Sequence, residues 1–246
     1  MRWRLPAIAL LCACLAGLAF ARPGPDSNYN IAISGGGGGP LTFTPTATAT
    51  AWQAAPTPPV TFSAVNIGTA SSDRIVAVVI TVDGNASNGV ISAVTIGGNP
   101  ATKAVGIDPG AAGQGDYIYY LKVTTGTTAN IVISCNGFPG GIGIAVGTIT
   151  GSATTTFSAS NTVGPSAVAD PHSLTTTVPS NGIGIVGVIV DRATTPTWTG
   201  ATGDANITEV GGNAMALLMA HTTNNSPSFT GANNFNLTMV AATFGP

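Results

Sequence analysis

DYIYYLKVTTGTTANIVISC, residues 116–135, is the stretch that decides the fold class. Apolar side chains recur at every second position in both of its arms. Tyr117 and Tyr119 share one face of the first arm, and Ile131 and Ile133 share one face of the second. A period of two is typical of a β-strand with one buried face, and the Thr-Thr-Gly-Thr-Thr segment between the arms is typical of a turn. We therefore predict two strands joined as a hairpin.

Short segments of the same kind recur from residue 60 to the end of the chain, separated by Gly, Pro and Asn turns such as residues 97–100. The strands expected from this pattern are 60–67, 74–82, 90–96, 101–105, 116–124, 129–135, 141–151, 155–161, 173–178, 182–191, 207–210, 214–222, 226–230 and 234–244. Many short strands with turn chemistry between them predict an all-β fold, an antiparallel, jelly-roll-like β-sandwich.

Two segments lack alternation because they are apolar on both faces: RIVAVVITV at 74–82 and GIGIVGVIV at 182–190. Such strands are expected in the middle of a sheet that is covered on both sides. GIGIAVG at 141–147 resembles the second segment, 41 residues earlier, but the flanking residues do not match. We interpret the two segments as independent buried strands rather than a repeat, and expect the glycines of both to let a facing sheet approach closely.

The N-terminal residues have the pattern of a secretory signal peptide at 1–21. Arg2 and Arg4 precede the apolar run LPAIALLCACLAGL, and Ala-Phe-Ala follows it. The run is short for a membrane span; a retained anchor helix and a lipid-modified Cys14 are the alternatives. Residues 22–59 are expected to form a flexible linker rich in Gly, Pro and Thr, with an edge strand or extended segment after residue 40. Residues 60–246 are expected to form the β-sandwich domain.

Charge is scarce: only 7% of the residues are Asp, Glu, Lys or Arg. Without residues 1–21 the chain keeps five basic and nine acidic residues, a net charge of about −4. No basic cluster is present, so we expect neither nucleic acid nor, after loss of the leader, membrane as a partner. Cys135 is then the single remaining cysteine, which excludes an intramolecular disulfide, and its place on the face of Ile133 is typical of a buried small apolar residue.

Catalytic patterns are absent from the sequence. His172 and His221 are the two histidines, and no nucleophile elbow, zinc-binding pair or cysteine–histidine cluster accompanies them. His172 is expected in a solvated loop, and His221 at the rim or in the core. The acidic residues lie mostly in turns, and residues 83–88 lack the Gly and Glu of a calcium loop, so a hairpin loop is expected there. We therefore expect no enzyme, no cofactor and no metal.

Trp198 is the residue that favours a ligand. It lies in TTPTWTGATGDAN, residues 194–206, together with Asp204 and Asn206. An exposed Trp stacks well on a sugar face, and nearby carboxylate and amide groups bind sugar hydroxyls. The alternative is a Trp that folds over the end of the sandwich, since most tryptophans are substantially buried. Trp198, Asp204 and Asn206 are the predicted ligand-binding residues.

The order of motifs over residues 60–246 resembles a β-sandwich module of phage tail-associated proteins and of bacterial extracellular proteins. The motifs that carry the resemblance are 62–68 followed by 73–78, VTIGGNPAT at 94–102, the aromatic strand 117–123 with its TGT turn at 125–127 and the strand at 130–134, 145–151, TVPSNG at 177–182, 214–221 and 237–244. The resemblance implies a jelly-roll-like sandwich on a cell or virion surface. It implies no established catalytic residues.

Two functions follow as expectations from this sequence. The signal peptide favours an exported, non-catalytic protein, secreted or on the cell surface, that attaches to or recognises a surface glycan or protein, with carbohydrate as the ligand class that Trp198 favours. The alternative is a structural or tail-fibre module of a virion, encoded by a prophage. A secreted hydrolase ranks below both because no pair of facing carboxylates is evident.

Overall fold

The computed structural model describes residues 39–46, 51–110, 113–151, 156–166, 172–190, 197–208, 215–230 and 237–246. Every regular element among these residues is a β-strand, and all the strand pairs are antiparallel, which confirms the all-β, antiparallel prediction. Residues 37–246 form one compact unit. The predicted signal peptide lies outside the described residues, as do residues 22–38 of the predicted linker.

The first half of this unit consists of two sheets. Its strands are β1 (Thr42–Pro45), β2 (Ala51–Ala54), β3 (Val60–Asn66), β4 (Ile75–Asp83), β5 (Ile91–Ile96), β6 (Asn99–Pro100), β7 (Thr102–Ile107), β8 (Gln114–Lys122), β9 (Thr128–Cys135) and β10 (Gly141–Thr150). The six-stranded sheet has the order β1-β10-β4-β8-β7, with β2 also paired to β10, and the four-stranded sheet has the order β3-β9-β5-β6. Strands β1 and β2 thus lie in the segment that was expected to be a linker.

The second half repeats this organisation. Its strands are β11 (Thr156–Ser166), β12 (His172–Ser173), β13 (Ile183–Val190), β14 (Thr197–Thr199), β15 (Thr202–Thr208), β16 (Ala216–Thr222), β17 (Ser228–Thr230) and β18 (Leu237–Gly245). The five-stranded sheet has the order β11-β18-β13-β16-β15, and the three-stranded sheet has the order β12-β17-β14.

The two halves have the same topology. If β2 and β6 are set aside, the remaining eight strands of the first half correspond in chain order to β11 through β18. The order β1-β10-β4-β8-β7 then becomes β11-β18-β13-β16-β15, and β3-β9-β5 becomes β12-β17-β14. In this correspondence the fully apolar strands β4 and β13 are equivalent, whereas β10 and β13 are not. The interpretation of 141–147 and 182–190 as independent strands is therefore confirmed, and the real repeat is one of topology.

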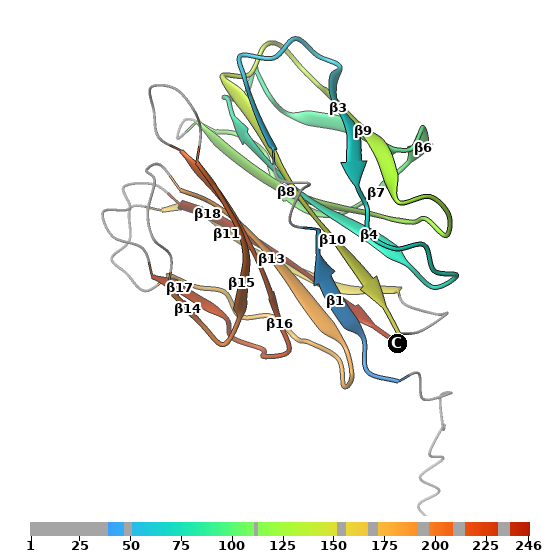
Figure 1. Cartoon of the computed structure of the whole chain (residues 1–246). Helices are drawn as coiled ribbons and strands as arrows, with labels where there is room; N and C mark the ends of the chain where they lie inside the picture. Colours follow the sequence, from blue (N-terminus) through green and yellow to red (C-terminus); the bar gives the residue numbers. More distant parts are fainter. Residues whose placement is uncertain are drawn as a thin grey trace, which may run out of the picture. The chain divides into compact units, whose positions relative to one another are not determined.

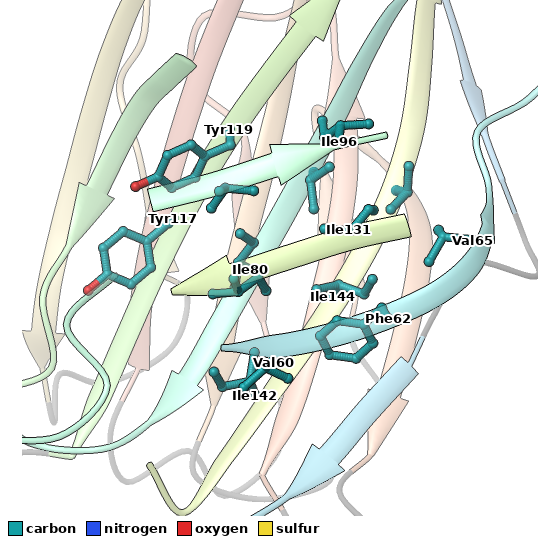
Figure 2. Packing of buried hydrophobic residues seen from close by; sticks show 14 of the residues in the cluster. Val60, Phe62, Val65, Ile80, Ile96, Tyr117, Tyr119, Ile131, Ile142 and Ile144 are labelled. Atoms are coloured by element: carbon teal, nitrogen blue, oxygen red, sulfur yellow. The ribbon is translucent and has the colours of Figure 1, made fainter. Parts of the chain in front are cut away.

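The sheets are arranged in layers (Figure 1), and the described residues form three apolar cores between them. The first core lies between the four-stranded and six-stranded sheets. Figure 2 shows Val60 and Phe62 of β3 and Ile131 of β9 facing Ile80 of β4 and Ile144 of β10. The central core lies between the six-stranded and five-stranded sheets, and the third core covers the other face of the five-stranded sheet. Because both large sheets are covered on both faces, their central strands are apolar on both faces.

Contacts across the central core relate the two halves symmetrically. Strand β8 packs against β18, and the equivalent strands β16 and β10 also pack against each other, while β4 packs against its own equivalent β13. The glycines of β13 make this approach close, as predicted. A Cβ at Gly187 would lie 2.6 Å from Cγ1 of Val79 on β4. The two halves therefore meet face to face through their larger sheets.

The predicted hairpin at 116–135 is wrong. Strand β8 pairs with β4 and β7 in the six-stranded sheet, whereas β9 pairs with β3 and β5 in the four-stranded sheet. The Thr-Thr-Gly-Thr-Thr segment therefore crosses between facing sheets. The predicted faces are right, because Tyr117, Tyr119, Ile131 and Ile133 all lie in the first core. A period of two identifies the buried face of each strand but not the strand to which it bonds.

Arg74 holds this crossing in place. The side chain is 0% exposed, and its guanidinium donates hydrogen bonds to five backbone carbonyls. Two of them, those of Ile67 and Gly68, belong to the β3–β4 connection at 3.1 and 2.6 Å. The other three belong to Val123, Thr125 and Gly126, at 2.7 to 2.9 Å. The connection after β3 and the connection after β8 are thus joined by one buried cation.

Other strand predictions need smaller corrections. The strand expected at 173–178 is limited to β12, and the residues after it are irregular. Strand β14 was not predicted at all, because TWT is too short to show a period. VTIGGNPAT contains the β5–β6 hairpin, with Ile96 opposite Asn99 and positive φ at Gly97 and Gly98. Glycine suits both positions because this two-residue turn needs the left-handed region.

Candidate functional site

The three residues predicted to bind a ligand come together in the second half. Trp198 lies on β14, and Asp204 and Asn206 lie on β15, the edge strand of the five-stranded sheet. With Gly203 and Ala205 they line an open hollow of about 330 Å³, which we call the Trp198 hollow. The hollow forms because β14 belongs to the three-stranded sheet and β15 to the five-stranded sheet, so the chain changes layer at the turn between them.

Trp198 is half-buried and has two neighbours. Part of its side chain packs against the third core, as the alternative of a Trp over the sandwich end requires. Its indole also lies over Gly203, where a Cβ would be 2.8 Å from Cδ1 and 2.9 Å from Nε1 of the ring. The remaining surface of the ring lines the hollow. A rigid aromatic wall that is packed from behind suits stacking, because its position is fixed before a ligand arrives.

Asp204 is held by His221 of β16. Nδ1 of His221 lies 2.9 Å from each carboxylate oxygen; the side chain of Asp204 is 3% exposed and that of His221 is 25% exposed. Strand β15 has a register shift between Gly203 and Ala205, which makes Asp204 the extra residue of a β-bulge. A bulge re-aims the side chain that it carries, here toward His221. Asp204 is therefore a positioning residue of the hollow, and its carboxylate is engaged from within the fold.

His221 connects the pair to a second hollow. Its ring stacks in a tilted arrangement on Phe43 of β1, with 5.1 Å between the centroids. It also lines a hollow of about 310 Å³ together with Thr202, Thr222 and Asn224. The wall of this second hollow is fixed by hydrogen bonds to the carbonyl of Gly200, which accepts from Oγ1 of Thr222 and, at 3.0 Å, from Nδ2 of Asn224. The Asp204–His221 pair thus lies between two polar hollows.

A third hollow, of about 600 Å³, lies in the first half. Its lining is rich in hydroxyl groups and comes from β1, β10 and the β3–β4 connection: Thr44, Pro45, Thr46, Asn66, Gly68, Thr69, Ala70, Ser71, Asp73, Thr148, Thr150 and Gly151. Asp73 accepts hydrogen bonds from Oγ of Ser71 and, at 2.8 Å, from the backbone N–H of Gly151. These bonds lower the pKa of the Asp73 carboxyl below its ordinary value, because they stabilise the ionised form.

The other residues singled out in the sequence have local roles. His172 is buried at 5% exposure in β12, so the expectation of a solvated loop was wrong. Residues 83–88 form a tight turn in which Asn85 and Asn88 exchange two backbone hydrogen bonds. Cys135 is half-buried against the first core, and desolvation raises the pKa of its thiol. The described residues contain no group of three or more His, Cys, Asp or Glu side chains placed to hold a metal ion.

Sequence reasoning missed the Asp204–His221 pair. Asp204 was predicted to bind a ligand, and its pairing with His221 becomes evident only when β15 and β16 are known to be neighbours and β15 to have a bulge at Asp204. Within the described part of the chain, no helix of a length and apolarity suited to crossing a membrane is found. Comparison with models of protein families, with curated proteins and with solved structures finds no match to this chain.

Proposed function

We propose that this chain is an exported, non-catalytic protein that recognises a surface ligand through the Trp198 hollow, with carbohydrate as the ligand class. One observation carries the proposal: the three residues selected from the sequence for sugar binding line the same open hollow. The leader pattern of residues 1–21 supports export, and the small number of charges supports a neutral, hydroxylated ligand.

Each residue of the hollow has a separate role in this proposal. Trp198 provides the stacking face, because a sugar ring presents C–H groups that pack on an aromatic surface. Asn206 is exposed and provides amide groups for hydrogen bonds to hydroxyls. Asp204 keeps β15 in its bulged shape through His221 rather than by contacting the ligand. The hollow is small and open, so a terminal sugar unit fits it better than the interior of a long chain.

A glycan array tests the proposal with the chain that lacks residues 1–21. We expect binding to a restricted set of glycans, loss of binding in Trp198→Ala, and weakened binding in Asn206→Ala. Trp198→Leu keeps an apolar side chain against the third core but has no aromatic face, so it separates lost stacking from lost folding. Phe138→Ala is the matched control, because Phe138 is 70% exposed in the β9–β10 loop of the other half. Absence of glycan binding by the unsubstituted chain would contradict carbohydrate recognition.

A further inference from the structure

Four polar side chains are completely buried in the central core, at the interface between the two halves. They are Thr81 of β4, Gln114 and Asp116 of β8, and Thr238 of β18, each 0% exposed. All four occupy the faces that the six-stranded and five-stranded sheets turn toward each other, since they alternate with residues of the first and third cores. The surroundings of these side chains in the central core are otherwise aliphatic and aromatic.

Three of the four lie beside one another on the six-stranded sheet. Thr81 and Asp116 are directly opposite across β4 and β8, which places their Cβ atoms roughly 5 Å apart. Gln114 is the next residue on the same face of β8. From the other sheet, Gly187 of β13 lies beneath Asp116, where an added Cβ would be 3.2 Å from both carboxylate oxygens. The missing side chain at Gly187 leaves the room that the carboxyl occupies.

Thr238 lies on the facing sheet. The rings of Tyr120 on β8 and Phe244 on β18 are in contact, with centroids 5.4 Å apart. Asp116 is four residues from Tyr120 on β8 and lies over Gly187 of β13. Strand β8 therefore lies over β18 at Tyr120 and over β13 at Asp116. Thr238 is opposite Ile189 of β13, two residues along that strand from Gly187.

Most of the polar atoms in this group have no hydrogen-bond partner among the described residues. Oγ1 of Thr81, Oδ2 of Asp116, Oγ1 of Thr238 and both terminal atoms of Gln114 form no hydrogen bond with any described residue. Oδ1 of Asp116 accepts from the backbone N–H of Tyr117 at 3.1 Å. Buried polar groups in proteins are almost always satisfied, and ordered water satisfies those that protein atoms do not reach.

We propose that Thr81, Gln114, Asp116 and Thr238 form a binding site for ordered water, enclosed between the two halves of the chain. The group contains donors as well as acceptors, and water both donates and accepts. A metal cation would bind the oxygens but would leave the amide N–H groups of Gln114 unsatisfied. Burial also raises the pKa of the Asp116 carboxyl well above its ordinary value, because desolvation disfavours the charged form.

The site also fixes how the two larger sheets sit on each other. An aliphatic interface alone tolerates sliding, whereas a polar group whose members come from three strands is satisfied in one register only. The water molecules are therefore part of the interface between the repeated halves, and the polar residues specify its alignment.

A high-resolution crystal structure of the full chain tests the site directly. We expect at least one ordered water that bonds to two or more of the four side chains. Direct hydrogen bonds that satisfy all of them without water, or a metal ion in the same place, would overturn the proposal.

Urea unfolding of the full chain provides a second test in solution. Asp116→Asn keeps a polar side chain of the same shape that can still bond to water, so its unfolding midpoint should stay close to that of the unsubstituted chain. Asp116→Leu removes the water's main partner, so its midpoint should fall. The midpoint should be equal in sodium chloride and choline chloride at the same ionic strength. A midpoint that rises with sodium, or an equal loss in both variants, would refute a water site at Asp116.

Discussion

Replacing Arg74 with Met would remove the five hydrogen bonds that join the β3–β4 connection to the β8–β9 crossing. Met has a similar apolar stem, so packing around the side chain is largely kept while the guanidinium is lost. The five carbonyl oxygens are those of Ile67, Gly68, Val123, Thr125 and Gly126. Thr125 and Gly126 are exposed, so their carbonyls regain water, whereas Ile67 is 1% exposed and its neighbours are partly covered.

The expected loss of stability depends on the carbonyl groups that stay buried and cannot form a hydrogen bond with water. Each buried acceptor left without a donor costs roughly 1–3 kcal/mol, and about two remain in that state, so we expect a loss of about 2–6 kcal/mol in the free energy of unfolding. That is a large part of the stability of a typical domain, about 5–15 kcal/mol. The stability of Arg74→Lys should lie between that of the unsubstituted chain and that of Arg74→Met, because an ammonium group has three donors and cannot span both connections.

Equilibrium unfolding in urea, followed by far-ultraviolet circular dichroism, measures this loss. Lys122→Met is the matched control: it removes one positive charge from an exposed position on β8 and should change stability by less than about 0.5 kcal/mol. If Arg74→Met were as stable as that control, the account of the crossing as a connection held by one buried cation would be refuted.

Three further predictions concern single positions. Gly187→Ala would place a Cβ 2.6 Å from Cγ1 of Val79, so overpacking should destabilise the chain by about 1–3 kcal/mol. Thermal unfolding measures this loss. Gly98→Ala is the control, because its Cβ would meet no atom within 4 Å and the substitution should cost only the strain of a positive φ. The Asp73 carboxyl has a lower pKa in the folded chain than in the unfolded chain, so the ionised group stabilises the fold above the unfolded-state pKa, and this contribution is lost as pH falls through the folded-state pKa. Asp73→Asn should therefore flatten the curve of stability against pH below about pH 4. An unchanged curve would contradict this assignment. Desolvation raises the pKa of the Cys135 thiol, so alkylation at pH 8 should be slower in the native chain than in urea, and equal rates would show that the thiol is not shielded.

The fold class was predictable because period-two patterning depends only on which face of a strand is buried. Tyr117 and Tyr119, and likewise Ile131 and Ile133, lie in the core that the alternation assigned to them. The partner of each strand was not predictable from the same signal. Strands β8 and β9 bury their apolar faces in one core from opposite sheets, and a crossing of this kind has the same alternation as a hairpin.

The four-sheet arrangement was only partly visible in the sequence. The fully apolar runs at β4 and β13 correctly indicated sheets covered on both sides, but not that these strands are equivalent members of two repeated halves. The two halves differ in the residues at equivalent positions: Arg74 directly precedes β4, whereas Gly182 directly precedes the equivalent strand β13. Topology can persist through such changes because many sequences satisfy the same burial pattern.

The candidate site was predictable in its residues and not in its geometry. Trp198, Asp204 and Asn206 were close in sequence and are together in space. The contact between His221 and the Asp204 carboxylate depends on a β-bulge and on the neighbouring strand. Neither feature can be predicted from the residue types of 194–206. Asp116, which opens the most regular stretch of the chain, gave no sign that its side chain is enclosed between two sheets.

The central claim is that the repeated halves stack through their larger sheets, with β8 and β9 in different sheets. Nuclear Overhauser contacts in the isotope-labelled full chain test both parts in one spectrum. We expect contacts between the ring protons of Tyr120 and Phe244, whose centroids are 5.4 Å apart, and backbone contacts from β8 to β4 but not to β9. Cross-strand backbone contacts between β8 and β9, with no contact between Tyr120 and Phe244, would contradict it.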